Sequence, residues 1–290
     1  MKLERYLDRI GLAKSPAITP AGLTTLQAAH RRAIGFENLD IPLGRGIRID
    51  SDNVFDKLVT RGRGGYCFEQ NRLFADMLTA VGITCRPFLA RVRLNAPEGT
   101  VPPRTHVGLL AELDGQAWLA DAGFGGSDLP PLPLKNGAEA WTPDGARHRL
   151  VRLGSAHEPG GEWRLDRAGP AAATDGRGAE HGGWHPQYSF DCIHVAPDDL
   201  EQANHWTSTR PGTRFTSLHV ASIVLPQGFA TMTERALTIH RDGVTQTHVV
   251  EDAAAYVRIL DDVFRIALRV EEARSLPLFG GAEKRFPTTV

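Results

Sequence analysis

The sequence predicts an α+β protein in which three parts follow one another along the chain. Apolar residues recur with helical spacing as far as Gly82, and the pattern then changes to the short apolar and β-branched runs typical of strands. A last amphipathic stretch predicts one more helix near the end of the chain. We therefore expect a helical part at residues 1–82, a small antiparallel β-barrel at 83–195, and a mixed α+β part at 196–290.

Three helices are expected in the first part. The first begins at the cap and proline formed by Thr19 and Pro20, the second is capped by Asp50 or Ser51, and the third ends at Gly82. Their apolar faces, in chain order, are Leu23, Leu26, His30 and Ala33; Val54, Phe55, Leu58 and Val59; and Phe74, Met77, Leu78 and Val81.

Turn signals separate the strands of the second part. Asp114-Gly115 is a strong hairpin signal, and the Gly- and Ala-rich stretch 168–183 is expected to be a mobile loop to which we assign no role. The expected β-rich stretches are 83–95, 106–124, 146–153, 161–167 and 187–195.

The third part mixes both kinds of element. A short helix is expected after Pro197, and a hairpin is expected to turn at Asp242-Gly243. The final helix is expected to run from about Asp252 to Arg269, with Ile259, Leu260, Val263, Phe264 and Ala267 directed inward.

Composition limits the function classes. Lys and Arg number 33 against 34 for Asp and Glu, so the chain lacks the basic footprint of a nucleic-acid binder. The charged start MKLERYLDRIGLAK lacks the apolar core of a signal peptide, and no apolar run reaches membrane-spanning length. The three cysteines cannot all pair and form no CxxC motif, which favours a reducing, cytoplasmic setting.

One cysteine stands in an unusual setting. Residues 61–67 read Arg-Gly-Arg-Gly-Gly-Tyr-Cys, and a helical pattern begins directly afterwards. Glycines allow a tight turn, and the unpaired amides at a helix start favour negative charge. A thiol placed there is expected to ionise more easily, so Cys67 is a candidate nucleophile.

The hairpin supplies candidate partners for Cys67. If Asp114-Gly115 is a two-residue loop, His106 and Asp121 are diagonal neighbours on one face of the paired strands. Gly108 and Gly123 would leave room for the contact. His106 could then take the thiol proton while Asp121 orients the ring. The opposite face suits a barrel core; its residues are Val107, Leu109, Ala111, Leu113, Trp118, Ala120 and Phe124.

Ordinary structural roles compete with this interpretation at each position taken alone. A cysteine is often a small buried hydrophobe, a histidine is often surface or core, and aspartate is a common turn former. The three together with the hairpin geometry favour a Cys-His-Asp acyl-transfer enzyme. Cys85 and Cys192 have no evident activating neighbour, and no spacing supports a metal site.

The motifs around these residues indicate a resemblance to a protein family. RGGYCFEQN at 63–71 closely resembles the arylamine N-acetyltransferase family, as do GFENLD at 35–40, THVGLL at 105–110 and DAGFGG at 121–126. YLDRIGL near the start and NHWTSTRP at 204–211 fit as well, so the resemblance covers essentially the whole chain. DAGFGG followed by a proline-rich stretch is similar to the bacterial branch.

The resemblance implies a cysteine-proteinase-like architecture of helical bundle, antiparallel β-barrel and α/β lid. It also implies a ping-pong reaction in which acetyl-coenzyme A (acetyl-CoA) acetylates Cys67 and an arylamine, arylhydrazine or arylhydroxylamine then accepts the acetyl group. No metal, prosthetic group, nucleic acid or membrane is expected, and the chain is expected to be a monomer or homodimer.

The resemblance also assigns site residues. Cys67, His106 and Asp121 match the catalytic positions, and Phe36 and Phe124 match aromatic positions that line the acyl and acceptor pocket. Arg63 and Glu37 match a pair that braces the loop before Cys67. The positions where coenzyme A (CoA) passes in relatives are Thr105, Gly125, Gly126 and Trp206.

Three alternatives stay open at this point. An amide synthase that closes macrolactams in antibiotic biosynthesis would use the same triad with a carrier-bound donor. A Cys-His-Asp hydrolase, whether protease or thioesterase, would use water as the acceptor. A binding protein would keep the three residues without using them.

Overall fold

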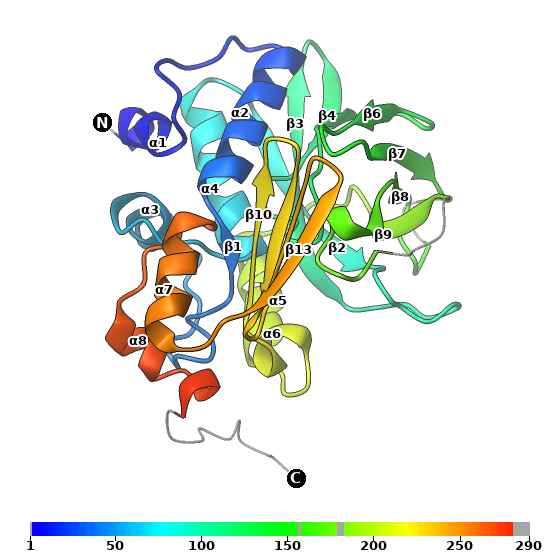
Figure 1. Ribbon diagram of the computed structural model, residues 1–290. Coiled ribbons are helices and arrows are strands. Elements are labelled where there is room, and N and C mark those ends of the chain that lie inside the picture. Colours follow the sequence, from blue (N-terminus) through cyan, green and yellow to red (C-terminus); the bar gives the residue numbers. More distant parts are fainter. Residues whose placement is uncertain (1, 156–157, 179–182, 281–290) are drawn as a thin grey trace.

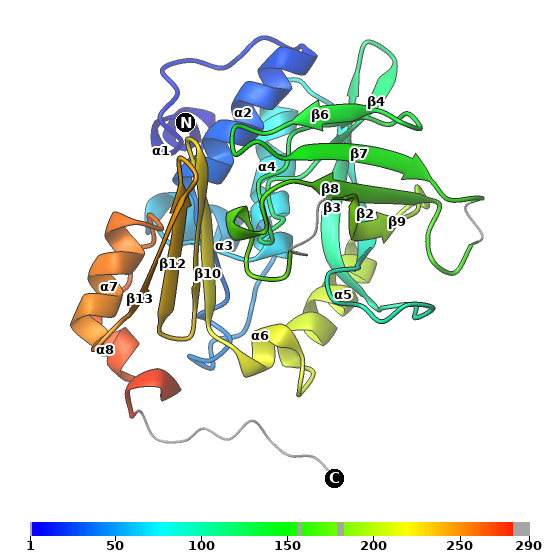
Figure 2. The same cartoon turned by 45° about the vertical axis from the view of Figure 1, so that its right-hand side comes forward.

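The computed structural model describes residues 2–155, 158–178 and 183–280. Two antiparallel sheets and the helices packed against them make up the molecule (Figures 1 and 2). The larger sheet has eight strands and the smaller has five. The α+β class is therefore confirmed, including an N-terminal helical region followed by an antiparallel sheet.

The helical region contains the three expected helices and one more. α2 (Pro20–Ala33) begins where Thr19 accepts a hydrogen bond from the Gly22 amide, and α3 (Ser51–Phe55) is capped by Asp50. α3 continues into a π-helical turn at Asp56–Thr60. α4 (Cys67–Ala80) ends before Gly82, whose φ of 91° is favourable only for glycine. The helix α1 (Lys2–Arg9) was not expected from the sequence.

The eight-stranded sheet curls around its own core into a nearly closed barrel (Figure 2). The strand order is β5-β4-β3-β2-β9-β8-β7-β6, so neighbours in the sheet are mostly neighbours in the chain. The short strands β5 and β6 were not expected. The strands are β2 (Cys85–Val92), β3 (Arg104–Leu113), β4 (Gln116–Ala120), β5 (Leu132–Pro133), β6 (Glu139–Trp141), β7 (Arg147–Arg152), β8 (Trp163–Ala168) and β9 (His185–Phe190).

The β3–β4 register is the one that a two-residue loop predicts. Leu109 pairs with Ala120 and Leu113 with Gln116, and both turn residues, Asp114 and Gly115, have positive φ. A type I′ turn requires positive φ at both central positions, which explains the Asp-Gly sequence. The expected alternation of side chains along the two strands is therefore confirmed.

The assignment of the two faces was mostly wrong. Most of the face expected to fill the barrel, including Leu109, Ala111 and Ala120, packs against the helical region instead. The face of His106 points into the barrel, where Leu110 and Phe124 join the core. Both faces of β3 are buried, so apolar alternation could not distinguish them.

Gly108 and Gly123 were expected to leave room for the contact between His106 and Asp121, but other groups occupy the space beside them. A Cβ on Gly108 would lie 2.4 Å from Cζ of Phe88, so the space is filled by that ring. A Cβ on Gly123 would lie 2.9 Å from Cα of Cys67, so this glycine lets the chain approach the start of α4.

The second sheet combines a strand from the helical region with strands from the C-terminal part of the chain. Its order is β1-β10-β11-β12-β13, so β1, from the helical region, pairs with the C-terminal strands. The expected turn at Asp242-Gly243 joins β12 and β13, whereas β10 and β11 were not expected. The elements are β1 (Phe36–Glu37), β10 (Val220–Leu225), β11 (Gly228–Thr233), β12 (Ala236–Arg241) and β13 (Val244–Val249).

Helices cover the second sheet. α5 (Pro197–Thr209), at the expected place, and α6 (Arg214–Ser217) connect the barrel to it, while α7 (Ala253–Asp262) and α8 (Val270–Arg274) pack on one face (Figure 1). The expected end of α7 at Arg269 is wrong. Arg265 has a φ of 59°, which a helix cannot accommodate, and Ala267 is exposed rather than buried.

The stretch expected to be a mobile loop has structure over its described part. A 3₁₀ turn at Ala171–Ala173 packs Ala173 against Val224 and Phe229 of the second sheet. Thr174 forms an isolated bridge with Ser127. The expectation for residues 179–182 lies outside the described residues.

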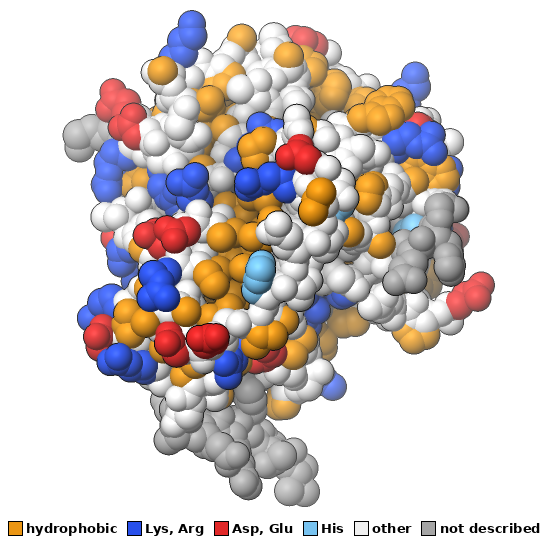
Figure 3. Space-filling view, viewed as in Figure 1, with side chains coloured by type: hydrophobic (Ala, Val, Ile, Leu, Met, Phe, Trp, Pro, Cys, Tyr) orange, Lys and Arg blue, Asp and Glu red, His pale blue; other side chains and the backbone are white. Residues whose placement is uncertain are grey.

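The face in Figure 3 carries hydrophobic side chains between α7 and strands β12 and β13. A shallow groove there is lined by Ile223, Leu225, Ile239 and Val263 together with Arg32 and Arg265.

Within the described part of the chain, no helix combines the length and apolar character needed to cross a bilayer.

Replacing Gly108 by alanine should lower the free energy of unfolding by about 1–3 kcal/mol, because the new methyl group would force the buried Phe88 ring out of its stack on Phe190. Urea unfolding measures the loss. Gly183→Ala is the matched control, since nothing described lies within 4 Å of a Cβ there. Equal stability of the two variants would contradict this account of the barrel core.

Candidate active site

Cys67 is the first residue of α4, and its side chain is almost completely buried. Its Sγ lies 3.7 Å from the carbonyl oxygen of Thr105, the residue that precedes His106. The backbone N–H of Tyr66 donates to Oε2 of Glu69 at 3.1 Å, so a capping interaction fixes the helix start. The Tyr66 hydroxyl donates to the side chain of Asn204 on α5.

His106 and Asp121 form the pair that the hairpin register predicts. Nε2 of His106 lies 2.7 Å from Oδ2 of Asp121, and both side chains are buried. This bond uses Nε2 as the donor and leaves Nδ1 as the nitrogen that can accept a proton. His106 and Cys67 line the same cavity, whereas Asp121 lies behind the histidine.

The carboxylate of Asp121 accepts hydrogen bonds from four donors. Oδ2 accepts from His106 and, at 3.0 Å, from the hydroxyl of Tyr188; Oδ1 accepts at 2.9 Å from both Nδ2 of Asn71 and the Gly123 amide. Burial opposes ionisation, but His106 and Asn71 outweigh it and lower the pKa of Asp121. The carboxylate is therefore charged and fixed in orientation.

Helix α2 braces the segment that holds this carboxylate. Oε1 of Gln27 accepts from the Asp121 amide at 2.8 Å. The guanidinium of Arg31 donates to the carbonyl oxygens of Asp121 and Phe124 at 3.1 and 2.9 Å. Both side chains are buried, so the backbone after β4 is tied to the helical region by polar contacts away from water.

The expectation that the helix start makes the Cys67 thiol ionise more easily is not confirmed. Burial, followed by the negative charge of Asp121, raises the pKa of the Cys67 thiol, although nearby backbone amides, including that of Val107, act in the other direction. An isolated thiolate is thus unfavourable here. A neighbour with positive charge would favour the anion, and His106 is a titratable side chain that lines the same cavity as Cys67.

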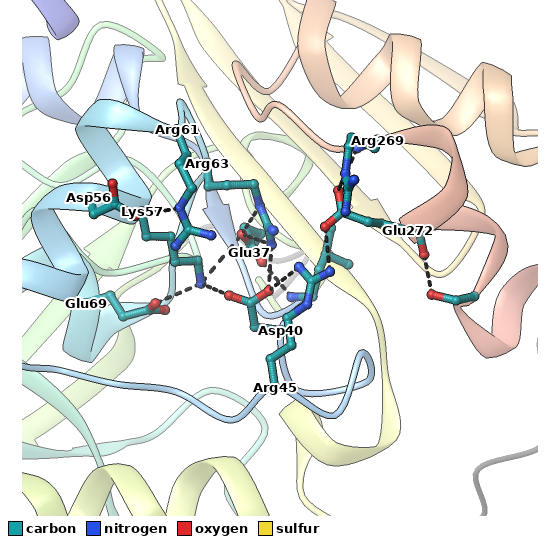
Figure 4. A network of polar contacts seen from close by, with 12 residues as sticks. Glu37, Asp40, Arg45, Asp56, Lys57, Arg61, Arg63, Glu69, Arg269 and Glu272 are labelled. Atoms are coloured by element: carbon teal, nitrogen blue, oxygen red, sulfur yellow. Dashed lines mark hydrogen bonds and ion pairs between the residues drawn. The ribbon is translucent and has the colours of Figure 1, made fainter.

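A buried ionic network lies beneath the loop before Cys67 (Figure 4). The expected contact between Arg63 and Glu37 is present, at 2.8 Å from Nη2 to Oε1. Asp40 joins it, at 3.1 Å from Arg63 and 2.8 Å from Lys57, and Lys57 lies 2.7 Å from Glu69. Three carboxylates thus share two buried cations, and Glu69 connects the network to the first turn of α4.

Two carboxyl groups of the network have pKa values shifted in opposite directions. Burial raises the pKa of Glu69 to about 7, with Glu37 and Asp40 adding to the rise and Lys57 opposing it. Burial also disfavours the charged form of Asp40, but Lys57 and Arg63 outweigh it and lower its pKa to about 2. Glu69 is therefore the member of the network that titrates near neutral pH.

The cavity at Cys67 has a volume of about 210 Å³. Its lining residues come from the barrel, the second sheet, α5 and α6. Of the residues expected at the site, those that line it are Cys67, His106, Phe36, Phe124, Thr105, Gly125 and Trp206. Gly126 is not among them; its carbonyl accepts from the Asp175 amide at 2.8 Å instead.

Several residues of the site were missed by the sequence analysis. Asn71 follows Cys67 by four positions, so its polar side chain on the same helical face was an available signal. Tyr188 and Arg31 are distant in sequence and gave none. Asp175 and Arg177 line the cavity from the stretch to which no role was assigned.

No group of three or more His, Cys, Asp and Glu side chains in residues 2–155, 158–178 and 183–280 is arranged to hold a metal ion. The three cysteines are all free thiols.

Comparisons with known proteins agree on one family. A family model described as N-acetyltransferase matches residues 21–273. An arylamine N-acetyltransferase of Escherichia coli is 33% identical over 279 residues, which cover 94% of this chain and 90% of the relative. The enzyme of that name from Mycobacterium tuberculosis is 33% identical, with coverages of 92% and 89%.

Solved structures give the same result. The arylamine N-acetyltransferase of Salmonella typhimurium superposes with a TM-score of 0.84 at 31% identity, covering 95% of this chain and 97% of that one. That of Mycobacterium marinum in complex with CoA gives 0.80 at 31% identity, with coverages of 94% and 97%.

Replacing Glu69 by glutamine should change how stability depends on pH. At pH values between the ordinary pKa of 4.5 and the raised pKa of about 7, Glu69 keeps its proton in the folded protein but loses it in the unfolded chain. The wild type therefore loses stability as pH rises through this window. Glutamine does not titrate, so Glu69→Gln lacks this loss. The free energy of unfolding of Glu69→Gln, minus that of the wild type, should therefore rise by about 1–3 kcal/mol as the pH increases through this window.

Urea unfolding at several pH values between 4 and 8 measures this difference. Glu272→Gln is the control, because the pKa of Glu272 is lowered to about 2 and its titration falls outside the window. If the difference in free energy of unfolding between Glu69→Gln and wild type does not change with pH, Glu69 is not the group that titrates near neutral pH.

Proposed function

The chain belongs to the arylamine N-acetyltransferase family, and we propose that it transfers an acetyl group from acetyl-CoA to arylamines, arylhydrazines or arylhydroxylamines. The observation that carries this proposal is the placement of Cys67 and His106 on one cavity, with Asp121 hydrogen-bonded behind the histidine. The relative from Salmonella typhimurium is named as both an N-acetyltransferase and an N-hydroxyarylamine O-acetyltransferase, which supports the inclusion of hydroxylamines.

The first half-reaction loads the enzyme. Nδ1 of His106 takes the thiol proton of Cys67, and the imidazolium is stabilised by the fixed charge of Asp121. The thiolate attacks the carbonyl carbon of acetyl-CoA, a new C–S bond forms, and the bond to the CoA sulfur breaks. The imidazolium returns its proton to the departing CoA thiolate, which leaves acetyl-Cys67 and neutral His106.

Backbone amides near the sulfur are suited to the tetrahedral intermediate. The amides of Phe68 and Val107 both favour negative charge at Cys67, the first from the helix start and the second from β3. We propose that amides at this position stabilise the oxyanion as it develops, as fixed donors do in other acyl transfers.

The second half-reaction transfers the acetyl group to nitrogen. An arylamine is weakly basic, so its nitrogen is unprotonated at neutral pH and can attack the carbonyl of acetyl-Cys67. His106 accepts the proton that the nitrogen loses, the C–S bond breaks, and the thiolate–imidazolium pair is restored. The low exposure of Cys67 supports a long-lived thioester, since water reaches it poorly.

The remaining site assignments rest on the cavity lining. We propose that Phe36 and Phe124 contact the acyl group and the aromatic ring of the acceptor. Thr105, Gly125 and Trp206, which also line the cavity, are proposed to contact CoA, whereas Gly126 would act from behind the lining by holding the Asp175 segment.

We propose a division of the chain into parts at 1–82, 83–195 and 196–290, in which β1 of the first part pairs with β10 of the third. Three free thiols support a reducing, cytoplasmic setting. We propose a monomer or homodimer that acts on small molecules.

The alternatives are less well supported. Macrolactam synthesis and hydrolysis would both use the same three residues, but the relatives compared above carry acetyltransferase names. A binding protein without activity would not need the buried, four-donor arrangement around Asp121.

Cys67→Ala should lower acetyl transfer at least about a thousandfold, because the covalent intermediate cannot form. The wild type mixed with acetyl-CoA alone should release one equivalent of CoA per active site and then nearly stop, while a hydrolase would continue.

Mass spectrometry should find one acetyl group on the Cys67 peptide after this treatment. Cys85→Ala is the matched control and should retain activity close to wild type, since Cys85 does not line the cavity. Acetyl transfer that survives in Cys67→Ala would refute the mechanism.

A further inference from the structure

A second cavity borders the elements that carry the catalytic residues. Its volume is about 400 Å³. α4 contributes Phe68 and Asn71 to its lining, whereas Cys67, the first residue of α4, lines the catalytic cavity. β3 contributes Val107, while His106 lines the catalytic cavity. Because neighbouring residues of a strand point to opposite faces, the two cavities lie on opposite faces of β3 at this point.

The inner wall of the second cavity is apolar. Ile49, Phe68, Val107 and Leu109 line it, and each is at most 7% exposed. The cavity volume falls within the range of about 300–1,000 Å³ that small-molecule sites occupy. Apolar surface facing such a space gains free energy when a hydrocarbon group covers it. The inner wall therefore fits a compact hydrocarbon body.

The charged side chains of the second cavity lie nearer to solvent. Among the described lining residues, Asp50, Asp76 and Glu201 carry negative charge and Arg72 carries positive charge. Nε of Arg72 lies 3.2 Å from Oδ1 of Asp76, and Arg48, which does not line the cavity, lies 3.3 Å from Oδ2 of Asp50. After these two pairings, the charge of Glu201, which is exposed on α5, stays in excess. The mouth of the cavity is thus negative.

The catalytic cavity has the opposite sign. Among the described residues that line it, the permanently charged ones are Asp175, Arg177 and Arg214. Nη2 of Arg177 and Nη2 of Arg214 lie 2.6 and 3.3 Å from the same oxygen of Asp175, so two cations share one carboxylate. A small cation is therefore attracted to the second cavity and repelled from the catalytic one.

We propose that the second cavity is a binding site for a small amphiphilic cation, consisting of a compact hydrocarbon body and one ammonium group. The body would cover Phe68, Val107 and Leu109, and the ammonium would stay near Glu201, where water still solvates it. An alkylammonium keeps its proton at neutral pH, so such a ligand is not an acyl acceptor. The site lies outside the catalytic cavity, and the inference does not rest on the proposed function.

Two free thiols can report where a ligand binds. Cys85 lines the second cavity and is partly exposed. Burial raises its pKa to about 11, so its alkylation is slow and is best followed in mildly alkaline buffer, in which an alkylamine still carries its charge. Cys192 is also partly exposed and does not line the cavity, which makes it an internal control.

The test measures alkylation of both thiols by N-ethylmaleimide, with 1-adamantylamine as the ligand and mass spectrometry of the two peptides as the readout. Saturating amine should slow the labelling of Cys85 at least about threefold, and Cys192 should change less than about twofold. The neutral analogue 1-adamantanol should bind about threefold to fivefold more weakly, the range of one exposed ion pair. The anion 1-adamantanecarboxylate should bind at least about tenfold more weakly than the amine.

Variants of the mouth should change the Kd for 1-adamantylamine in opposite directions. Glu201→Lys should raise it about tenfold, and Arg72→Gln should lower it about threefold. Glu139→Lys makes the same change of charge on β6, outside the lining, and should stay within about twofold of wild type. Ala75→Phe places a ring in the cavity and should abolish binding in a ligand-observed NMR titration. Circular dichroism checks that each variant is folded.

Three results would overturn the inference. The first is equal protection of Cys85 and Cys192 by the amine, and the second is protection of Cys67 in place of Cys85, which would put the amine in the catalytic cavity. The third is the same Kd in the wild type, Glu201→Lys and Glu139→Lys. All of these readouts concern binding alone, so they decide the inference whether or not the protein transfers acetyl groups.

Discussion

The rest of the site depends on the buried carboxylate of Asp121. Four hydrogen bonds, from His106, Tyr188, Asn71 and the Gly123 amide, hold both of its oxygens in place. A charge without water around it is tolerated only when donors replace the lost solvation. The same bonds fix the imidazole of His106 with Nε2 toward the carboxylate, which leaves Nδ1 as the nitrogen that takes the thiol proton in the proposed mechanism. Burial and the charge of Asp121 raise the pKa of Cys67, so in the proposed mechanism the sulfur ionises as the partner of a protonated His106. We therefore propose that activation comes mainly from the arrangement of the three side chains, with the amides of the helix start acting in the same direction.

This constraint explains how the fold is put together around the site. The helical region and the barrel both hold the carboxylate: α4 acts through Asn71, the barrel through β3 and β9, and α2 through Gln27 and Arg31, which hold the backbone from Asp121 to Phe124. Small side chains are required where these parts meet, and Gly123 lies against Cα of Cys67 for that reason. The ionic network of Glu37, Asp40, Lys57, Arg63 and Glu69 fixes the loop before Cys67 in the same way (Figure 4). The second sheet then closes the cavity from the other side, with Ser222 and Thr231 in its wall.

Local signals explain what the sequence could predict. The Asp114-Gly115 turn fixes the β3–β4 register, and from that register the contact between His106 and Asp121 follows by counting residues. The caps at Thr19 and Asp50 likewise predicted two helix starts. Where the prediction failed, the deciding contacts are distant in sequence. The two faces of β3 are both buried, so only packing against α4 shows which one points into the barrel. α7 ends early because the backbone of Arg265 is in the left-handed conformation, and no glycine in the sequence marks that position. Asp175 and Arg177 reach the cavity from a stretch without periodicity, and their partner Arg214 is 39 residues from Asp175.

The central claim is that His106, held by Asp121, makes the Cys67 thiolate at neutral pH. The most direct measurement is the rate of Cys67 alkylation by iodoacetamide as a function of pH, followed on the Cys67 peptide by mass spectrometry, in the wild type and in Asp121→Asn. The account predicts that the wild-type rate is already near its plateau at pH 7, below the ordinary thiol pKa of about 8.5, and that the variant reaches its plateau only above that value. The same pH profile in both proteins would contradict the account.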